Sequence, residues 1–165
     1  MIISIADWVF DVDMETNIEY SSLQAAEHCT CGYCRNYYQS IDSAYPDVRP
    51  FFAQFGINIE GPDELSPFEP TIYEATFVIN GRILQTGKLR IAVDNVPVMV
   101  QTADEADLDS ERPMPYFALT IGLMELPWVL DEPMDDVVSP ANEELYMQRM
   151  WKKLMKRAEM EDVVS

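Results

Sequence analysis

Hydrophobic and polar residues alternate most regularly at the start of the chain. Within residues 1–13, Trp8 and Phe10 share one face of an extended chain, and Ile3 lies on the opposite face. A strand with apolar side chains on both faces is typical of the interior of a sheet. We therefore expect residues 1–13 to form an inner strand. The pattern weakens over residues 14–30, where we expect a connection.

Helical spacing appears after this connection. Residues 34–43 carry apolar side chains on one helical face, and residues 48–55 repeat the pattern in a second short helix that ends before Gly56. We expect the apolar stripe of the second helix to lie in the core. Its members are Val48, Phe51, Phe52 and Phe55.

Strand patterns dominate the middle of the chain. Asn80-Gly81 separates residues 71–79 from residues 82–86 and is a strong hairpin signal, because a type I′ turn needs positive φ at both central residues. Further strands are expected at 88–94, 96–101 and 116–124, and an acidic loop is expected at 102–112.

A C-terminal amphipathic helix is the clearest single element in the sequence. Ser139 and Pro140 suit its first two positions, and basic residues in its later turns suit the helix dipole. Its apolar stripe is Met147, Met150, Trp151, Leu154 and Ala158. Together these elements predict one α+β domain over residues 1–165. We expect an antiparallel sheet of five or six strands, with two short helices after a cysteine cluster at 29–34 and the C-terminal helix packed on it.

Composition and charge narrow the classes of function. The 165 residues are 48% hydrophobic and 24% charged, as in ordinary soluble proteins, and no apolar run reaches the ~18 residues of a membrane span. The first residues lack the basic region and cleavage site of a secretory signal, so we expect a cytoplasmic protein with reduced cysteines. The net charge of −18, from 29 acidic and 11 basic residues, argues against binding to nucleic acid or to an anionic membrane.

The acidic charge itself has two interpretations. It serves solubility alone, or it forms a face that recognises a basic protein partner, as in immunity proteins and inhibitors. The contact region expected for such a partner is the 102–112 loop together with Asp131, Glu132, Asp135 and Asp136. The sequence leaves both interpretations open.

All three cysteines and the single histidine fall within the seven residues His28-Cys29-Thr30-Cys31-Gly32-Tyr33-Cys34. Soft ligands gathered in this way favour zinc, which prefers four thiolate or imidazole ligands in a tetrahedron. Cys31 and Cys34 lie at the start of a predicted helix, where backbone N–H groups favour the thiolate form. We therefore predict a structural zinc site formed by Cys29, Cys31 and Cys34. His28 is the nearest fourth ligand, and a distant carboxylate or a water is the alternative.

Two other roles stay open for the cysteines, namely a thiol–disulfide pair or reduced side chains with a structural role. The tetrapeptide Cys31-Gly32-Tyr33-Cys34 resembles the active-site tetrapeptide of thioredoxin-fold proteins, and this resemblance implies redox exchange. In that fold a hydrophobic strand precedes the motif. Here the preceding residues 20–27 are short and polar.

A wider resemblance covers residues 29–81. The string Cys29-x-Cys31-x-x-Cys34-Arg35-Asn36-Tyr37, followed by an acidic proline-containing loop, resembles a group of small bacterial proteins with no established function. The resemblance implies a shared unit of fold and no activity.

The sequence lacks the common catalytic patterns. The chain has one histidine, no G-x-S-x-G turn and no glycine cluster for phosphate, so we expect no enzyme.

Overall fold

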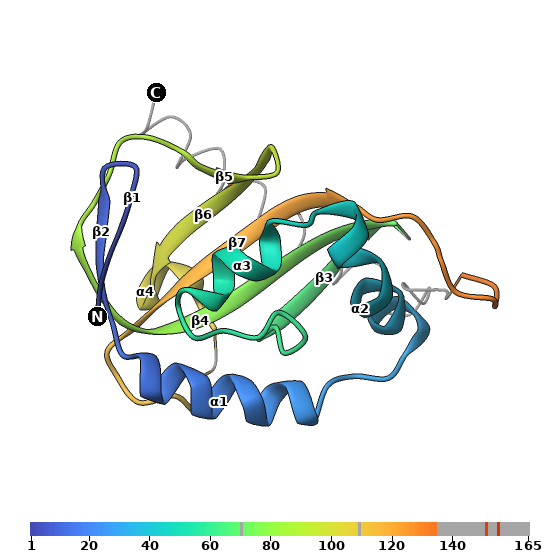
Figure 1. Ribbon diagram of the computed structural model, residues 1–165, viewed down its shortest axis with the longest axis horizontal. Coiled ribbons are helices and arrows are strands. Elements are labelled where there is room, and N and C mark those ends of the chain that lie inside the picture. Colours follow the sequence, from blue (N-terminus) through green and yellow to red (C-terminus); the bar gives the residue numbers. More distant parts are fainter. Residues whose placement is uncertain (70, 109, 135–150, 152–154, 156–165) are drawn as a thin grey trace.

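An antiparallel sheet forms the centre of the protein (Figure 1). The structure is a computed structural model that describes residues 1–69, 71–108, 110–134, 151 and 155. Within these residues the sheet has seven strands, in the order β1-β2-β4-β7-β6-β5, and β3 pairs with β4. The strands are β1 (Ile2–Ile5), β2 (Trp8–Val12), β3 (Glu64–Glu69), β4 (Ile72–Gln85), β5 (Ile91–Val93), β6 (Val96–Thr102) and β7 (Tyr116–Glu125). The predicted α+β class is confirmed, with one more strand than the upper end of our expectation.

Helices join the strands and cover the sheet. They are α1 (Met14–Ala26), α2 (Gly32–Ala44), α3 (Val48–Ala53) and the short α4 (Ala103–Ala106). In Figure 1, α3 lies over β4 and β7, and the rings of Phe52 and Phe77 lie 4.4 Å apart. Val48, Phe52 and Phe55 are fully buried, which confirms the predicted apolar stripe. The predicted helices after the cysteine cluster are therefore both present, as α2 and α3.

The predicted inner strand at 1–13 is instead a hairpin of two strands, and β1 lies at the sheet edge. Contacts with a distant loop hold its turn. The Asp7 carboxylate accepts the backbone N–H groups of Lys88 and Leu89, and Trp8 Nε1 donates to the Leu89 carbonyl at 2.8 Å. The same contacts shorten the strand predicted at 88–94 to β5, because its first residues bond to the turn of the hairpin.

The connection predicted at 14–30 is wrong over most of its length, because residues 14–26 form α1. The side chain of Asp13 caps the helix by accepting the N–H of Thr16. The buried residues of α1 are polar: Asn17 is fully buried and exchanges two hydrogen bonds with the backbone of Asn80, at 2.7 and 3.3 Å. A helix that packs through amide groups leaves no apolar stripe in the sequence, which is why hydrophobic periodicity missed it.

A buried arginine completes this polar interface between α1 and the sheet. Arg112 is 5% exposed, and its Nη1 donates to the side-chain oxygens of Asn17 and Asn80, both at 3.2 Å. Its Nη2 donates to Gln24 Oε1 at 3.0 Å. The guanidinium thereby joins the 110–115 segment to α1 and β4.

The hairpin predicted at Asn80-Gly81 is wrong, because β4 runs without interruption through both residues. Gly81 has φ +147°, and a Cβ there would lie 2.2 Å from the carbonyl oxygen of Asp11 on β2. The glycine therefore permits a close approach of two strands and does not form a turn. The left-handed pair that closes a hairpin is Asp94-Asn95, between β5 and β6, with φ 51° and 65°.

The remaining predictions concern the second half of the chain. The strands at 96–101 and 116–124 are confirmed as β6 and β7, and the acidic 102–112 loop contains α4. The predicted C-terminal helix lies outside the described residues, apart from Trp151 and Met155, whose side chains are exposed. In the described part of the chain, no helix combines the length and apolar character needed to cross a bilayer.

Candidate metal centre

The three cysteine sulfur atoms lie close together, within 4.8 Å of one another. Cys29 belongs to the loop between α1 and α2, Cys31 is the N-cap of α2, and Cys34 lies in its first turn. Two thiolates bound to one tetrahedral zinc ion at ~2.3 Å are about 3.8 Å apart, so sulfurs within 4.8 Å of one another are near the spacing that a shared ion requires. Among the described residues, no other group of three or more His, Cys, Asp or Glu side chains meets this criterion.

Backbone amides of the helix start already point at two of the sulfurs. Cys34 N donates to Cys31 Sγ at 3.4 Å, and Cys31 N donates to Cys29 Sγ at 3.5 Å. Cys31 has extended dihedral angles, φ −65° and ψ 159°, and its thiol takes the place of the usual serine or aspartate cap. N–H donors and the positive end of the helix both favour negative charge on sulfur.

The helix that carries the cysteines is fixed to the sheet by its first turns. The Tyr33 hydroxyl donates to the carbonyls of Ser66 on β3 and Ile72 on β4, and the Tyr73 hydroxyl donates to the Tyr33 carbonyl at 2.9 Å. The rings of Tyr33 and Tyr73 stack with centroids 4.0 Å apart. These contacts place Cys34 and Cys31 at a defined position beside β3 and β4.

Cys34 is a half-buried thiol next to two exposed ones. Burial raises the pKa of the Cys34 thiol, and the hydrogen bonds and charges of Cys31 and Cys29 raise it further. Three neighbouring sulfurs cannot all carry negative charge unless a cation offsets the repulsion. The raised pKa keeps the Cys34 thiol neutral in the metal-free protein, so a metal ion bound there would have to displace its proton.

His28 lies beside the sulfur group without belonging to it. Its ring stacks on Tyr38, with centroids 4.3 Å apart and planes 19° apart, and the Tyr38 hydroxyl donates to the Cys29 carbonyl. The His28 Nδ1 atom is buried and has no hydrogen-bond partner in the described part of the chain. Of the four predicted ligands, the structure thus brings together the three cysteines and places the histidine next to them.

A cavity of about 360 Å³ opens beside the cysteines, and the sequence contained no signal for it. Its wall includes His28, Cys29, Cys34, Tyr38, Glu60 and Asp63. Burial and the neighbouring cysteines raise the pKa of the Tyr38 hydroxyl, and burial raises the pKa of the Asp63 carboxyl. Burial in the cavity wall thus favours the neutral forms of both side chains.

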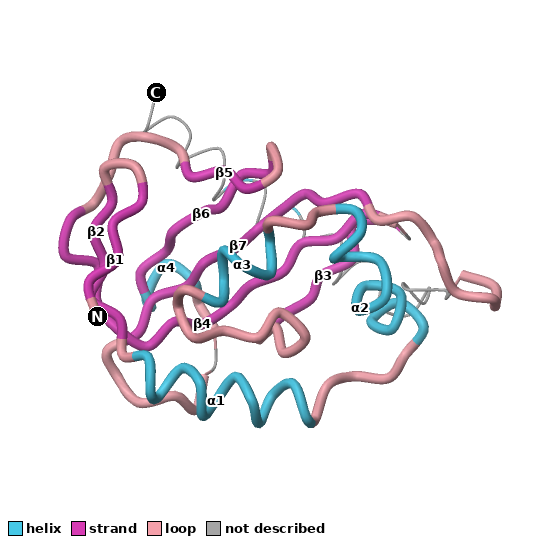
Figure 2. The backbone as a smooth tube through the Cα atoms, in the orientation of Figure 1, coloured by secondary structure: helices cyan, strands magenta, loops and turns pink. Residues whose placement is uncertain are grey.

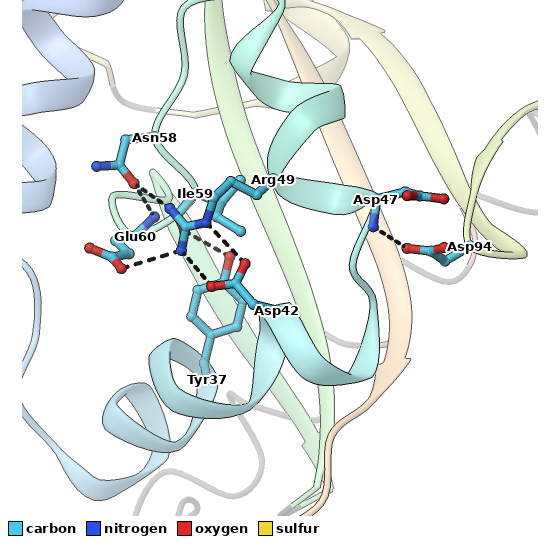
Figure 3. Close-up of polar contacts among 8 residues, drawn as sticks. All are labelled: Tyr37, Asp42, Asp47, Arg49, Asn58, Ile59, Glu60 and Asp94. Atoms are coloured by element: carbon cyan, nitrogen blue, oxygen red, sulfur yellow. Dashed lines mark hydrogen bonds and ion pairs between the residues drawn. The ribbon is translucent and has the colours of Figure 1, made fainter.

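The loop that closes this cavity is held to α2 and α3 by the contacts drawn in Figure 3. Arg49 donates two hydrogen bonds to Asp42, at 2.9 and 3.1 Å, and one to Glu60 at 3.3 Å. The Tyr37 hydroxyl donates to the Ile59 carbonyl at 2.8 Å. Residues 60–63 line the cavity together with Cys29 and Cys34, although about thirty positions separate the two regions in sequence. The sequence pattern therefore did not connect them.

The thioredoxin-like tetrapeptide stands in a different context from the one that its resemblance implies. The tube in Figure 2 passes from α1 through a loop directly into α2, so a helix precedes the motif where a strand was expected. All strand pairs in the described residues are antiparallel, and none forms a βαβ unit. The structure therefore gives the tetrapeptide no support as a redox centre of that fold.

No family model matches the chain, and neither curated proteins nor solved structures include one that is detectably similar to it. The geometry of the cysteine loop is thus the ground for a functional proposal.

Proposed function

We propose that this protein binds one zinc ion in the cysteine loop, through Cys29, Cys31 and Cys34, with His28 as the fourth ligand. The observation that carries the proposal is the convergence of three sulfurs within 4.8 Å at a helix N-terminus. Zinc suits this donor set because it is thiophilic, accepts imidazole and binds tetrahedrally.

Two properties of His28 support it as the fourth ligand. Its Nδ1 is buried without a hydrogen-bond partner among the described residues, and a buried polar atom left in that state costs free energy. The residue also lines the same cavity as Cys29 and Cys34. Coordination would satisfy the nitrogen, and it requires the ring to move closer to the three sulfurs.

The role of such an ion is structural. Four protein ligands leave no open position for a substrate, in contrast to catalytic zinc sites. The ion would join the end of α1 to the start of α2 and offset the charge of three thiolates.

Metal analysis of untagged protein tests the proposal. We expect close to one zinc per chain in the wild type and none in the variant with Cys29, Cys31 and Cys34 all replaced by serine. The variant Thr30→Ala, which changes the same loop without removing a ligand, serves as the matched control and should keep its zinc. His28→Ala should weaken zinc binding at least tenfold in competition with a chelator.

Cobalt substitution gives an independent reading, because three cobalt–thiolate bonds produce intense charge-transfer absorption. The zinc site would be refuted if the wild-type protein, as purified without added chelator, contained no metal and had three rapidly titrating thiols. A loss of two free thiols after mild oxidation would instead support a Cys31–Cys34 redox pair.

A further inference from the structure

Helix α2, which carries Cys34, contacts a second segment of the chain, residues 126–132, which follows β7. Leu126 is fully buried and its N–H donates to the Thr71 carbonyl, so the segment leaves the sheet from a fixed point. In Figure 1 it continues from β7 past α2. The side chains of Arg35 and Asn36 in the first turns of α2 then bond to the segment.

Arg35 is the link between the two regions. Its Nε donates to the Thr30 carbonyl at 2.8 Å, and its Nη2 donates to Glu132 Oε1 at 2.6 Å. Thr30 stands between the ligands Cys29 and Cys31, and Arg35 directly follows the ligand Cys34. One guanidinium therefore bonds both to the backbone between two metal ligands and to the 126–132 segment.

Asn36 holds the middle of the same segment. It is fully buried, its Nδ2 donates to the Pro127 carbonyl at 3.1 Å, and its Oδ1 accepts the Val129 N–H at 2.8 Å. Trp128 Nε1 then donates to the Glu132 carbonyl at 2.8 Å, which closes the segment on itself. The segment thus has one buried anchor at Asn36 and one exposed anchor at Arg35.

We infer that zinc binding in the cysteine loop is coupled to the fixation of residues 126–132 through Arg35, so that this segment is a metal-responsive element. The inference rests on the proposed zinc site. An ion bound by Cys29 and Cys31 fixes the Thr30 carbonyl between them, which positions Arg35 to hold Glu132. Ordering either region lowers the entropic cost of ordering the other, and such coupling is reciprocal: Glu132 must favour zinc binding as much as zinc favours the Arg35–Glu132 contact.

The size of the coupling follows from the exposure of the link. The side chains of Arg35 and Glu132 are 41% and 38% exposed, and exposed ion pairs are worth little. We expect Glu132→Gln to weaken zinc affinity about two- to fivefold. Asp131→Asn is the matched control, because it removes the same charge one residue away from the link and should leave the affinity unchanged.

Hydrogen exchange of the amides at 126–132, measured with and without zinc, tests the inference. We expect zinc to slow exchange at Val129 and its neighbours in the wild type and in Asp131→Asn, and to have little effect in Glu132→Gln. Acrylamide quenching of Trp128 fluorescence gives a second measurement, with the signal of the other tryptophans subtracted by use of the Trp128→Phe protein. We expect zinc to reduce this quenching in the wild type and in Asp131→Asn. Arg35→Lys should lose the response, because one ammonium cannot reproduce the two directions of the guanidinium.

Zinc content is measured on the same samples, so the two possible failures are distinct. If zinc binds and exchange at 126–132 does not change, the coupling is refuted and the zinc site stands. Equal zinc affinity and equal exchange in wild type and Glu132→Gln would refute it as well. If no zinc binds, both the site and the coupling fall.

Discussion

The close approach of β2 to β4 at Gly81 gives the sharpest test of the fold, because sequence pattern and structure disagree there. We consider the substitution Gly81→Ala. In the structure, φ at this residue is +147°, and the new Cβ would lie 2.2 Å from the Asp11 carbonyl oxygen and 3.0 Å from Val12 Cα. The methyl group therefore meets paired backbone, which cannot move aside as a flexible side chain would.

Two costs add at this position. A non-glycine residue in a sparsely populated backbone region costs about 1–3 kcal/mol, and overpacking a well-filled site costs a further ~1–3 kcal/mol. We therefore expect Gly81→Ala to lower the free energy of unfolding by about 2–6 kcal/mol.

Gly56→Ala is the matched control. Gly56 also has positive φ, +80°, but an added Cβ would meet its nearest atoms at 3.2 Å, so only the left-handed backbone and minor crowding are penalised. We therefore expect Gly56→Ala to lower the free energy of unfolding by about 1–2 kcal/mol.

Urea unfolding followed by circular dichroism measures both effects. The middles of the two ranges differ by about 2.5 kcal/mol. With a urea dependence of roughly 1–3 kcal/mol per molar, we expect the midpoint of Gly81→Ala to lie about 1–2.5 M below that of Gly56→Ala. A two-residue turn at Asn80-Gly81 would penalise alanine only through its backbone angle. Equal midpoints for the two variants would therefore refute the continuous β4 strand and its close contact with β2.

Three further predictions concern the polar groups of the protein. Replacing the buried Arg112 with methionine removes the arginine donor from the side-chain oxygens of Asn80 and Gln24, and one of two donors from Asn17 Oδ1. The change should lower the free energy of unfolding in urea by about 2–4 kcal/mol, whereas Arg82→Met at an exposed position should stay within ~0.5 kcal/mol. Burial raises the pKa of Asp63, so the native form binds a proton more tightly than the unfolded form, and the contribution of Asp63 to stability falls as pH rises from the ordinary Asp pKa through the raised one. Asp63→Asn should remove this part of the pH dependence above the ordinary Asp pKa of about 3.9, and identical slopes in both proteins would contradict the assignment. The role of the acidic surface stays a prediction. If the charge serves solubility alone, neutralising Asp104, Glu105, Asp107 and Asp109 should change the free energy of unfolding by no more than ~0.5 kcal/mol each. A basic partner that the wild type captures and the four-site variant loses would support recognition instead.

The sequence by itself determined the features that depend on neighbours along the chain. The stripe from Val48 to Phe55 predicted a buried helix because helical spacing brings those side chains to one face. The three cysteines were predicted to meet because six residues contain them all, so only the local turn at the start of α2 had to form. The strand at 116–124 was predicted from its apolar run in the same way.

Tertiary structure decided what depends on contacts between distant residues. Helix α1 buries Asn17 against Asn80, and the cost of burying an amide is met only by a partner sixty-three positions away. At Gly81 the same residue type suits a turn or a close strand crossing, and the neighbouring β2 decides between them. Two further features depend on residues that are distant in sequence. They are the cavity wall at Glu60 and Asp63 and the contact between Arg35 and Glu132. Local pattern carries no information about these pairs, because the free energy that selects them comes from groups that meet only in the folded chain.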